Sequence, residues 1–119
     1  TGSGNHLDGN GAGTLTNLGN GGPGYLLSSN GNTLTSNRAE ANLEGGFVVQ
    51  VANLLRSNRA NGNQGIGFHI AGTDSGLDTN VGEMNSGPEF VIAPNNSNLN
   101  GNRANGVTFS FGTNGGSFE

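Results

Sequence analysis

Cysteine and lysine are both absent from this chain of 119 residues, and arginine occurs only four times. Without cysteine there can be no disulfide, no thiolate zinc site and no cysteine nucleophile. The formal net charge is −4. Nucleic acids and anionic membranes are bound by clustered positive charge, so this composition argues against both as partners.

Long apolar runs are also missing. No segment approaches the roughly 18 apolar residues of a membrane span, and no signal peptide is visible before Thr1. Leu, Ile, Val and Phe together make up only about a fifth of the chain, close to the level at which chains become disordered. What is abundant is 24 Gly and 21 Asn, both turn-favouring residues, and this excludes a protein built of long helices.

An internal repeat organises almost the whole chain. Its clearest copies are Leu34–Ala39, Leu55–Ala60 and Leu99–Ala104, with weaker copies at Leu77–Gly82 and Leu7–Ala12. From Leu34 onward the leucines recur with a nearly constant period of about 22 residues. An aromatic segment follows each copy, as in Gly46-Phe47-Val48-Val49. The step from Leu7 to Leu34 is longer, which predicts an inserted loop within residues 13–24.

Two β-type segments per repeat, separated by Asn and Gly, predict rungs that stack and bury a common core. We expect one all-β solenoid domain of about five rungs spanning residues 1–119, either part of a longer solenoid or a fibre subunit. Three columns of large side chains should point inward. They are Leu7, Leu34, Leu55, Leu77 and Leu99; Tyr25, Phe47, Phe68, Phe90 and Phe109; and Leu27, Val49, Ile70, Ile92 and Phe111.

Asparagine recurs three positions after each of these leucines, at Asn10, Asn37, Asn58, Asn80 and Asn102. An amide side chain carries both a donor and an acceptor, so amides stacked about 4.8 Å apart can bond along the stack. We therefore predict a structural asparagine ladder. A second polar column, Asn5, Asn32, Asn53, Ser75 and Ser97, lies two positions before the leucines.

The Leu-x-x-Asn-x-Ala segment followed by Gly-Phe-x-Val, or by Gly-Phe-x-Ile as in Gly67–Ile70, resembles the repeat of the right-handed parallel β-helix (pectin-lyase-like) superfamily. That resemblance implies a right-handed coil with internal asparagine ladders. It does not choose an activity, because the superfamily includes polysaccharide lyases, hydrolases and epimerases, phage tailspikes and non-catalytic adhesins.

The best local group of chemically active side chains is His69, Asp74 and Asp78. A histidine there could abstract a proton, and the carboxylates could hold calcium or a sugar. The simpler interpretation is a solvated histidine beside turn-forming aspartates. We predict no catalytic residue, metal or cofactor for this chain and keep these three residues as candidate ligand-binding positions.

Arg38, Arg59 and Arg103 share one column, interrupted by Val81. A row of guanidinium groups could bind an acidic polysaccharide. Glu40 and Glu83 lie two residues beyond this column in alternating rungs, however, and surface ion pairs with them are the favoured interpretation.

One further column should alternate away from the core: Leu26, Val48, His69, Val91 and Ser110. Three of the five side chains are apolar, although a solvent-facing strand is normally polar there. Either the inserted loop or a partner should cover Leu26, Val48 and Val91, and the sequence gives the two equal weight.

These features lead to one functional prediction and one alternative. We expect a secreted or cell-surface structural module, such as a stalk, an adhesin segment or a fibre subunit that assembles end to end. The alternative is a segment of a polysaccharide-active β-helix protein: a lyase, hydrolase, epimerase or glycan-binding module. Unprotected solenoid ends favour addition of further strands, which motivates the fibre version.

Overall fold

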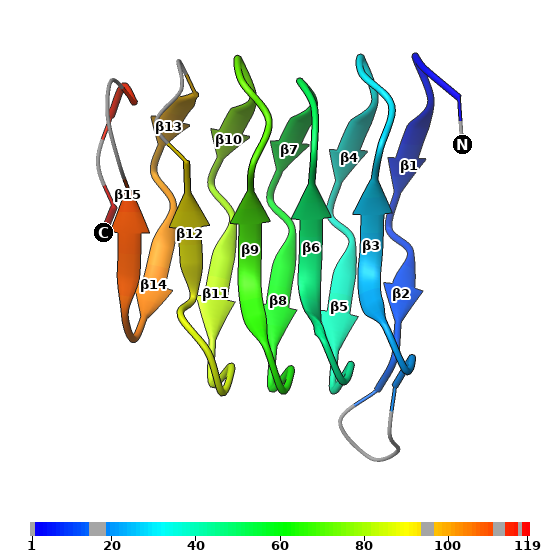
Figure 1. Ribbon diagram of the computed structural model, residues 1–119, viewed down its shortest axis with the longest axis vertical. Helices are drawn as coiled ribbons and strands as arrows, with labels where there is room; N and C mark the ends of the chain where they lie inside the picture. Colours follow the sequence, from blue (N-terminus) through cyan, green and yellow to red (C-terminus); the bar gives the residue numbers. More distant parts are fainter. Residues whose placement is uncertain (1, 15–18, 94–96, 111–113, 117) are drawn as a thin grey trace.

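The computed structural model describes residues 2–14, 19–93, 97–110, 114–116 and 118–119. Fifteen strands form three parallel sheets there, each of five strands, and no helix occurs in these residues, hence none that could cross a membrane (Figure 1). The chain visits the three sheets in turn, so one strand of each makes a rung. The predicted β-solenoid with a period near 22 residues is confirmed, with about four turns.

We name the sheets by their side chains. The leucine sheet contains β1 (His6–Asp8), β4 (Thr33–Thr35), β7 (Leu54–Arg56), β10 (Gly76–Asp78) and β13 (Asn98–Asn100). The arginine sheet contains β2 (Gly11–Ala12), β5 (Arg38–Glu40), β8 (Arg59–Asn61), β11 (Val81–Glu83) and β14 (Arg103–Asn105). The aromatic sheet contains β3 (Pro23–Leu27), β6 (Gly45–Val49), β9 (Ile66–Ile70), β12 (Phe90–Ile92) and β15 (Thr108–Ser110).

Each rung has three strands where the sequence predicted two. The Leu-to-Ala segment divides at a corner, because the residue just before each ladder asparagine takes a left-handed conformation. Ser36, Ser57 and Thr79 have φ of 57°, 52° and 54°. Such a φ turns the chain sharply and is uncommon for residues other than glycine, so it was not visible from residue type alone.

The core consists of the predicted columns over most of the stack. Phe47, Phe68 and Phe90 are fully buried, and their rings stack at centroid distances of 4.8 and 4.7 Å with interplanar angles of 2° and 8°. Tyr25 continues the stack on Phe47 at 4.7 Å. The ring spacing equals the strand spacing of a β-sheet, so the register of the sheet also sets the register of the rings.

The prediction that Phe109 extends this column is wrong. In the last rung Phe90 is aligned with Thr108, and Phe109 is aligned with the outward-facing Val91. The interval from Phe90 to Phe109 is shorter than the other aromatic intervals, and the shortened rung places its aromatic residue on the opposite face of the strand. Phe118 covers Phe90 instead, at 4.8 Å and 52°. Phe111 lies outside the described residues.

Residues 114–116 and 118–119 lie against the last strands of the leucine and arginine sheets at the C-terminal end of the coil. The Gly115 N–H donates to the Ser97 carbonyl at 2.9 Å, and Gly115 accepts from the Leu99 N–H at 2.7 Å. Further along, the Glu119 N–H donates to the Asn102 carbonyl at 2.7 Å. These bonds satisfy the exposed edges of β13 and β14, which would otherwise be free to pair with another strand.

Candidate functional site

The outer face of the aromatic sheet carries an exposed apolar column. We name it the outer stripe: Leu26, Val48, His69, Val91 and Phe109, which are aligned from strand to strand. Leu26 is 56% exposed and Phe109 is 46% exposed, and the three central members are half-buried. The one-residue shift in the last rung places Phe109 where Ser110 was expected, so four of the five side chains are apolar.

Alternation along the strands explains why these side chains face outward. In β6, Phe47 and Val49 are buried and Val48 between them is half-buried. In β9, Phe68 and Ile70 are buried on either side of His69. Successive side chains of a strand point to opposite faces, so an inward aromatic residue and an inward aliphatic residue force the middle one toward solvent.

The described part of the inserted loop packs at a corner of the coil. The Gly19 N–H donates to the Ala41 carbonyl at 2.9 Å, and the Leu43 N–H donates to the Asn20 carbonyl at 3.0 Å. Both contacts lie between the arginine and aromatic sheets, beyond the end of β5. Residues 15–18 lie outside the described residues. These two hydrogen bonds hold Gly19 and Asn20 at this corner.

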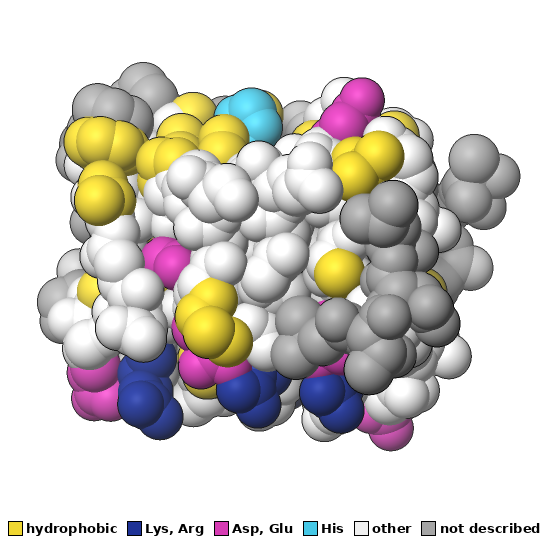
Figure 2. All heavy atoms as spheres, turned by 90° about the horizontal axis from the view of Figure 1, so that it is seen from below, with side chains coloured by type: hydrophobic (Ala, Val, Ile, Leu, Met, Phe, Trp, Pro, Cys, Tyr) yellow, Lys and Arg dark blue, Asp and Glu magenta, His cyan; other side chains and the backbone are white. Residues whose placement is uncertain are grey.

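The arginine sheet presents its charges as ion pairs. Arg38 pairs with Glu40, to which its Nε donates at 3.0 Å, and Arg59 pairs with Glu83. Arg38 and Glu40 lie on the same strand, whereas Arg59 and Glu83 lie on neighbouring strands. Surface ion pairs of this kind were the interpretation that the sequence favoured. Arg103 is exposed on β14 and shares a shallow hollow with Glu83 and Glu119. In Figure 2 the arginine side chains lie along one edge, while hydrophobic groups and a histidine gather along the opposite edge.

The three candidate ligand-binding residues lie on different elements. His69 is on β9 of the aromatic sheet, Asp78 is on β10 of the leucine sheet, and Asp74 lies in the corner between them with φ of 56°. Asp78 has other partners: Asn100 Nδ2 at 2.9 Å and Arg56 Nε at 4.0 Å. Within the described ranges, no three His, Cys, Asp or Glu residues are grouped so that they could hold a metal ion.

The asparagine ladder occupies a corner between the leucine and arginine sheets. Asn37 Nδ2 donates to Asn58 Oδ1 at 3.1 Å, Asn58 Nδ2 donates to Asn80 Oδ1 at 3.0 Å, and Asn80 Nδ2 donates to Asn102 Oδ1 at 3.0 Å. Each backbone N–H donates to the same oxygen, as Asn58 N does to Asn80 Oδ1 at 2.9 Å. All four side chains are fully buried, so these bonds satisfy groups that water cannot reach.

A third asparagine column was missed by the sequence analysis. Asn42 Nδ2 donates to Asn63 Oδ1 at 2.9 Å, and Asn63 Nδ2 donates to Asn85 Oδ1 at 2.8 Å. The column ends on the carboxylate of Glu89, which is 2% exposed and accepts from Asn85 Nδ2. These three asparagines repeat with the period of the leucines, so a search of every Asn for that period could have found them.

No family model, curated protein or solved structure matches the chain.

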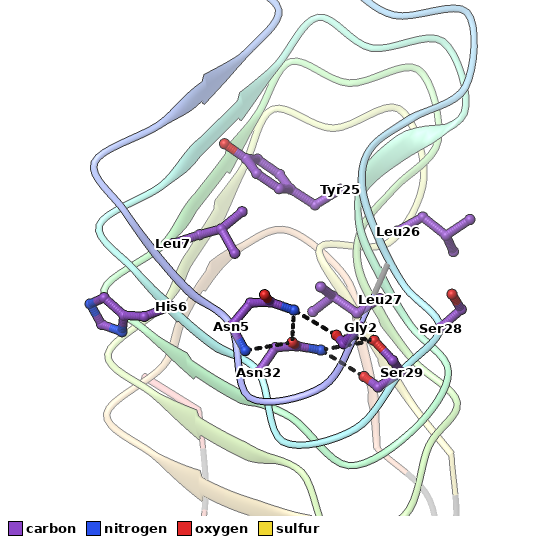
Figure 3. A pocket seen from close by; sticks show the side chains of 10 residues that line it. All are labelled: Gly2, Asn5, His6, Leu7, Tyr25, Leu26, Leu27, Ser28, Ser29 and Asn32. Carbon is purple, nitrogen blue, oxygen red and sulfur yellow. Dashed lines mark hydrogen bonds between the residues drawn. The ribbon is translucent and has the colours of Figure 1, made fainter.

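A hollow of about 350 Å³ opens at the N-terminal end of the coil (Figure 3). Leu7, Tyr25, Leu27 and Asn32 are among the residues that line it. The Tyr25 hydroxyl donates to the Asn10 carbonyl at 2.9 Å. Partial burial raises the pKa of this phenol above its ordinary value of 10.0, because desolvation disfavours the phenolate.

Proposed function

We propose that this chain is a structural β-solenoid module of a secreted or cell-surface protein, a stalk or adhesin segment that presents the outer stripe to a partner. The observation that carries the proposal is the stripe itself. Four apolar side chains lie in one column across five strands, and the two at its ends are about half exposed. Contiguous exposed apolar surface on a soluble domain is characteristic of an interaction site.

The interior supports a structural role. Each rung is joined to the next by strand pairing in three sheets and by buried amide columns at the corners. A stack built this way gains its stability from repeated nearest-neighbour contacts, so it can hold surface side chains in a fixed, regular array. That property suits a stalk or an adhesin more directly than it suits a catalyst.

Between the versions of this role, we favour a stalk or adhesin over a fibre that grows head to tail. Gly115 and Glu119 bond to the backbone at β13 and β14, so a second copy could add to these two strands only after displacing these two residues. Electron microscopy of the purified chain over a concentration series distinguishes the versions. Short monodisperse particles are expected, and filaments that lengthen with concentration would support the fibre instead.

The second candidate is a polysaccharide-active segment of a pectin-lyase-like protein, which the repeat resembles. Its support is the column of Arg38, Arg59 and Arg103. Glu40 and Glu83 neutralise the first two arginines, which weakens the attraction of that column for an acidic polysaccharide. Incubation with pectate, alginate and neutral glycans, followed by product and binding analysis, tests this candidate directly.

The proposed role is tested in cells that make the chain. Antibody labelling and protease treatment of intact cells, together with detection in the medium, should find the chain outside the cell. Adhesion should then fall when Leu26, Val48 and Val91 are all replaced by Thr, a β-branched residue that suits a strand and presents less apolar surface. The matched control replaces Thr33 and Thr35 of the leucine sheet by Val. An intracellular chain, or unchanged adhesion by the stripe variant, contradicts the proposal.

A further inference from the structure

The three sheets differ in charge. The five strands of the aromatic sheet contain no Asp, Glu or Arg. The leucine sheet carries the ion pair of Arg56 with Asp78, and the arginine sheet carries that of Arg59 with Glu83. A partner that recognises charge therefore finds no complement on the aromatic sheet. Its outer face suits a partner whose contact surface is also uncharged.

Exposed apolar side chains gather on the same side of the coil. Among the described residues, five large apolar side chains are between 40% and 64% exposed. Two of them, Leu26 and Phe109, belong to the outer stripe. The other three lie in the corners that lead from the arginine sheet into the aromatic sheet: Leu43, Met84 and Val107. Apolar surface is thus concentrated on and beside the uncharged sheet, on the side opposite the arginines in Figure 2.

This face is large enough for a protein partner. The molecule measures 37 Å by 31 Å in the view of Figure 1, where the aromatic sheet lies in front. Each partner of a standard protein interface contributes about 800 Å². A second copy of the chain would bring a face of equal size that is also apolar and uncharged. Its formal net charge of −4 would stay on the other two sheets and the corners, so repulsion between the copies would be small.

His69 is the polar member of the outer stripe. It is half-buried and aligned between Val48 and Val91 on the two neighbouring strands. Among the described residues, the ion pairs of the chain do not include His69. Burying an unpaired polar group is costly, so whatever covers the stripe has to offer the imidazole a hydrogen bond.

The charged groups next to the flanking strands are directed elsewhere. Glu89 precedes β12, but it is 2% exposed and accepts from Asn85. Glu44 precedes β6, and its carboxylate lies beside Gly22, where a Cβ would be 3.7 Å from Oε2. On the outer faces of β6 and β12, the residues aligned with His69 are both valines. The imidazole therefore has no carboxylate facing it from these strands.

We propose that a second copy of this chain covers the outer stripe face to face, with two-fold symmetry that places the two His69 side chains opposite each other. A neutral imidazole has one donor and one acceptor, so two of them can bond to each other while the apolar members of the stripes pack together. A shift by one rung would instead place each imidazole against an apolar side chain. The inference rests on the stripe being an interaction surface, as in the proposed function, and names its partner.

This arrangement makes association depend on pH. Histidine changes its charge between about pH 8 and pH 5. When both copies of His69 are protonated, two like charges face each other in an apolar interface, so proton binding favours the monomer. The dimer should be present at neutral pH and lost as the pH falls. We expect the dissociation constant to rise at least about tenfold between about pH 7.5 and about pH 5.5.

Sedimentation equilibrium of the full chain, from about 1 µM to about 1 mM, provides the test. At pH 7.5 we expect a monomer–dimer equilibrium with no larger species. The Leu26→Thr, Val48→Thr, Val91→Thr variant should remain monomeric, and Thr33→Val with Thr35→Val on the leucine sheet is its matched control. His69→Gln should dimerise at both pH values, because the amide also carries a donor and an acceptor but does not titrate. His6→Gln should keep the pH dependence.

Cross-linking tests the register independently. The chain has no cysteine, so a single introduced thiol is unique. Packed sheets lie about 10 Å apart, a separation that a short bismaleimide can span. His69→Cys should give a covalent dimer in high yield, and Thr35→Cys on the outer face of the leucine sheet should not. A dimer that forms without cross-linking at position 69 overturns the proposed register.

The remaining outcomes separate this inference from the proposed function. Monomers at every concentration, open-ended assemblies, a stripe variant that still dimerises, or unchanged pH dependence in His69→Gln would each overturn the inference. The proposed function would survive these results if adhesion still depended on the stripe. A dimer with the expected pH dependence, formed by a chain that cells retain inside, would instead support the inference and contradict the proposed function.

Discussion

The buried carboxylate of Glu89 accepts hydrogen bonds from Asn85 four residues earlier, from its Nδ2 and, at 3.4 Å, from its backbone N–H. In the rungs before it, the same two groups of each asparagine donate to the amide oxygen of the next asparagine. Glu89 therefore replaces the oxygen of a missing asparagine, and it ends the column with an acceptor that has no amide donor of its own to satisfy.

Replacing Glu89 with Gln should destabilise the chain. The amide keeps one acceptor but brings an N–H₂ donor to a buried position that faces the donors of Asn85. We expect a loss of about 1–3 kcal/mol in the free energy of unfolding, measured by denaturant titration. The exposed Glu44→Gln serves as the control and should change the free energy by less than about 0.5 kcal/mol. Equal stability of the two variants would mean that Glu89 does not terminate the column.

Replacing Asn58 with Asp should be more damaging. Asn58 Nδ2 donates to Asn80 Oδ1 at 3.0 Å and to the Leu34 carbonyl at 2.9 Å, and its side chain is fully buried. A carboxylate would face both acceptors without donors, so we expect a loss of about 3–5 kcal/mol. Asn30 is exposed, and Asn30→Asp should be nearly neutral in the same unfolding experiment. A neutral Asn58→Asp variant would refute the ladder.

Glycine precedes the aromatic residue in three rungs because the next strand approaches closely. A Cβ on Gly67 would lie 2.5 Å from the Glu89 carbonyl oxygen. Gly67→Ala should therefore cost more than about 2 kcal/mol, since neither strand can move without breaking the register. Gly11→Ala meets nothing within 4 Å and should cost much less. Thermal unfolding of the two variants, followed by circular dichroism, compares them; similar midpoints would contradict the close approach.

Tyr25 is the only tyrosine, so absorbance at alkaline pH titrates this residue alone. Its raised pKa predicts a midpoint above 10 in the folded chain. Below about pH 10 both states are protonated and stability does not depend on this group. Above pH 10 the unfolded state loses its proton first, so stability should fall as pH rises toward the folded pKa. In the Tyr25→Phe variant that part of the alkaline destabilisation should disappear; its persistence would assign it to another group.

The shortened last rung gives opposite expectations for two aromatic residues. Phe109→Ala should change the free energy of unfolding by less than about 1 kcal/mol, because that side chain is 46% exposed on the outer face. Phe90→Ala should cost about 3–5 kcal/mol, since it removes a fully buried ring from the stack. Denaturant unfolding measures both. A large loss for Phe109→Ala would indicate that Phe109 lies in the buried aromatic column, as the sequence alone suggested.

Regular periodicity made most of the fold predictable. The nearly constant intervals between Leu34, Leu55, Leu77 and Leu99 predict the leucine sheet, and the aligned strands confirm the register. The division of each Leu-to-Ala segment was not predictable from residue type, because Ser57 and Thr79 adopt a left-handed conformation that these residues rarely show.

The end of the coil was harder to predict. Glu89 occupies the position that glycine holds before Phe47 and Phe68, and this departure from the motif was the available signal that the third column ends there. The outer stripe was predicted from alternation at Leu26, Val48 and Val91. Its last member, Phe109, depends on the shortened rung, and a repeat-based alignment places that residue on the wrong face.

The outer stripe and the buried columns exist only if successive rungs lie in register. Nuclear Overhauser effects between the ring protons of Phe47, Phe68 and Phe90, measured on the chain in solution, test this most directly. The stacked geometry, with centroids 4.7–4.8 Å apart, predicts strong cross-peaks from Phe68 to both of the others, and from Tyr25 to Phe47. Absence of cross-peaks between Phe68 and both neighbours, in a folded sample, would contradict the solenoid and the surfaces derived from it.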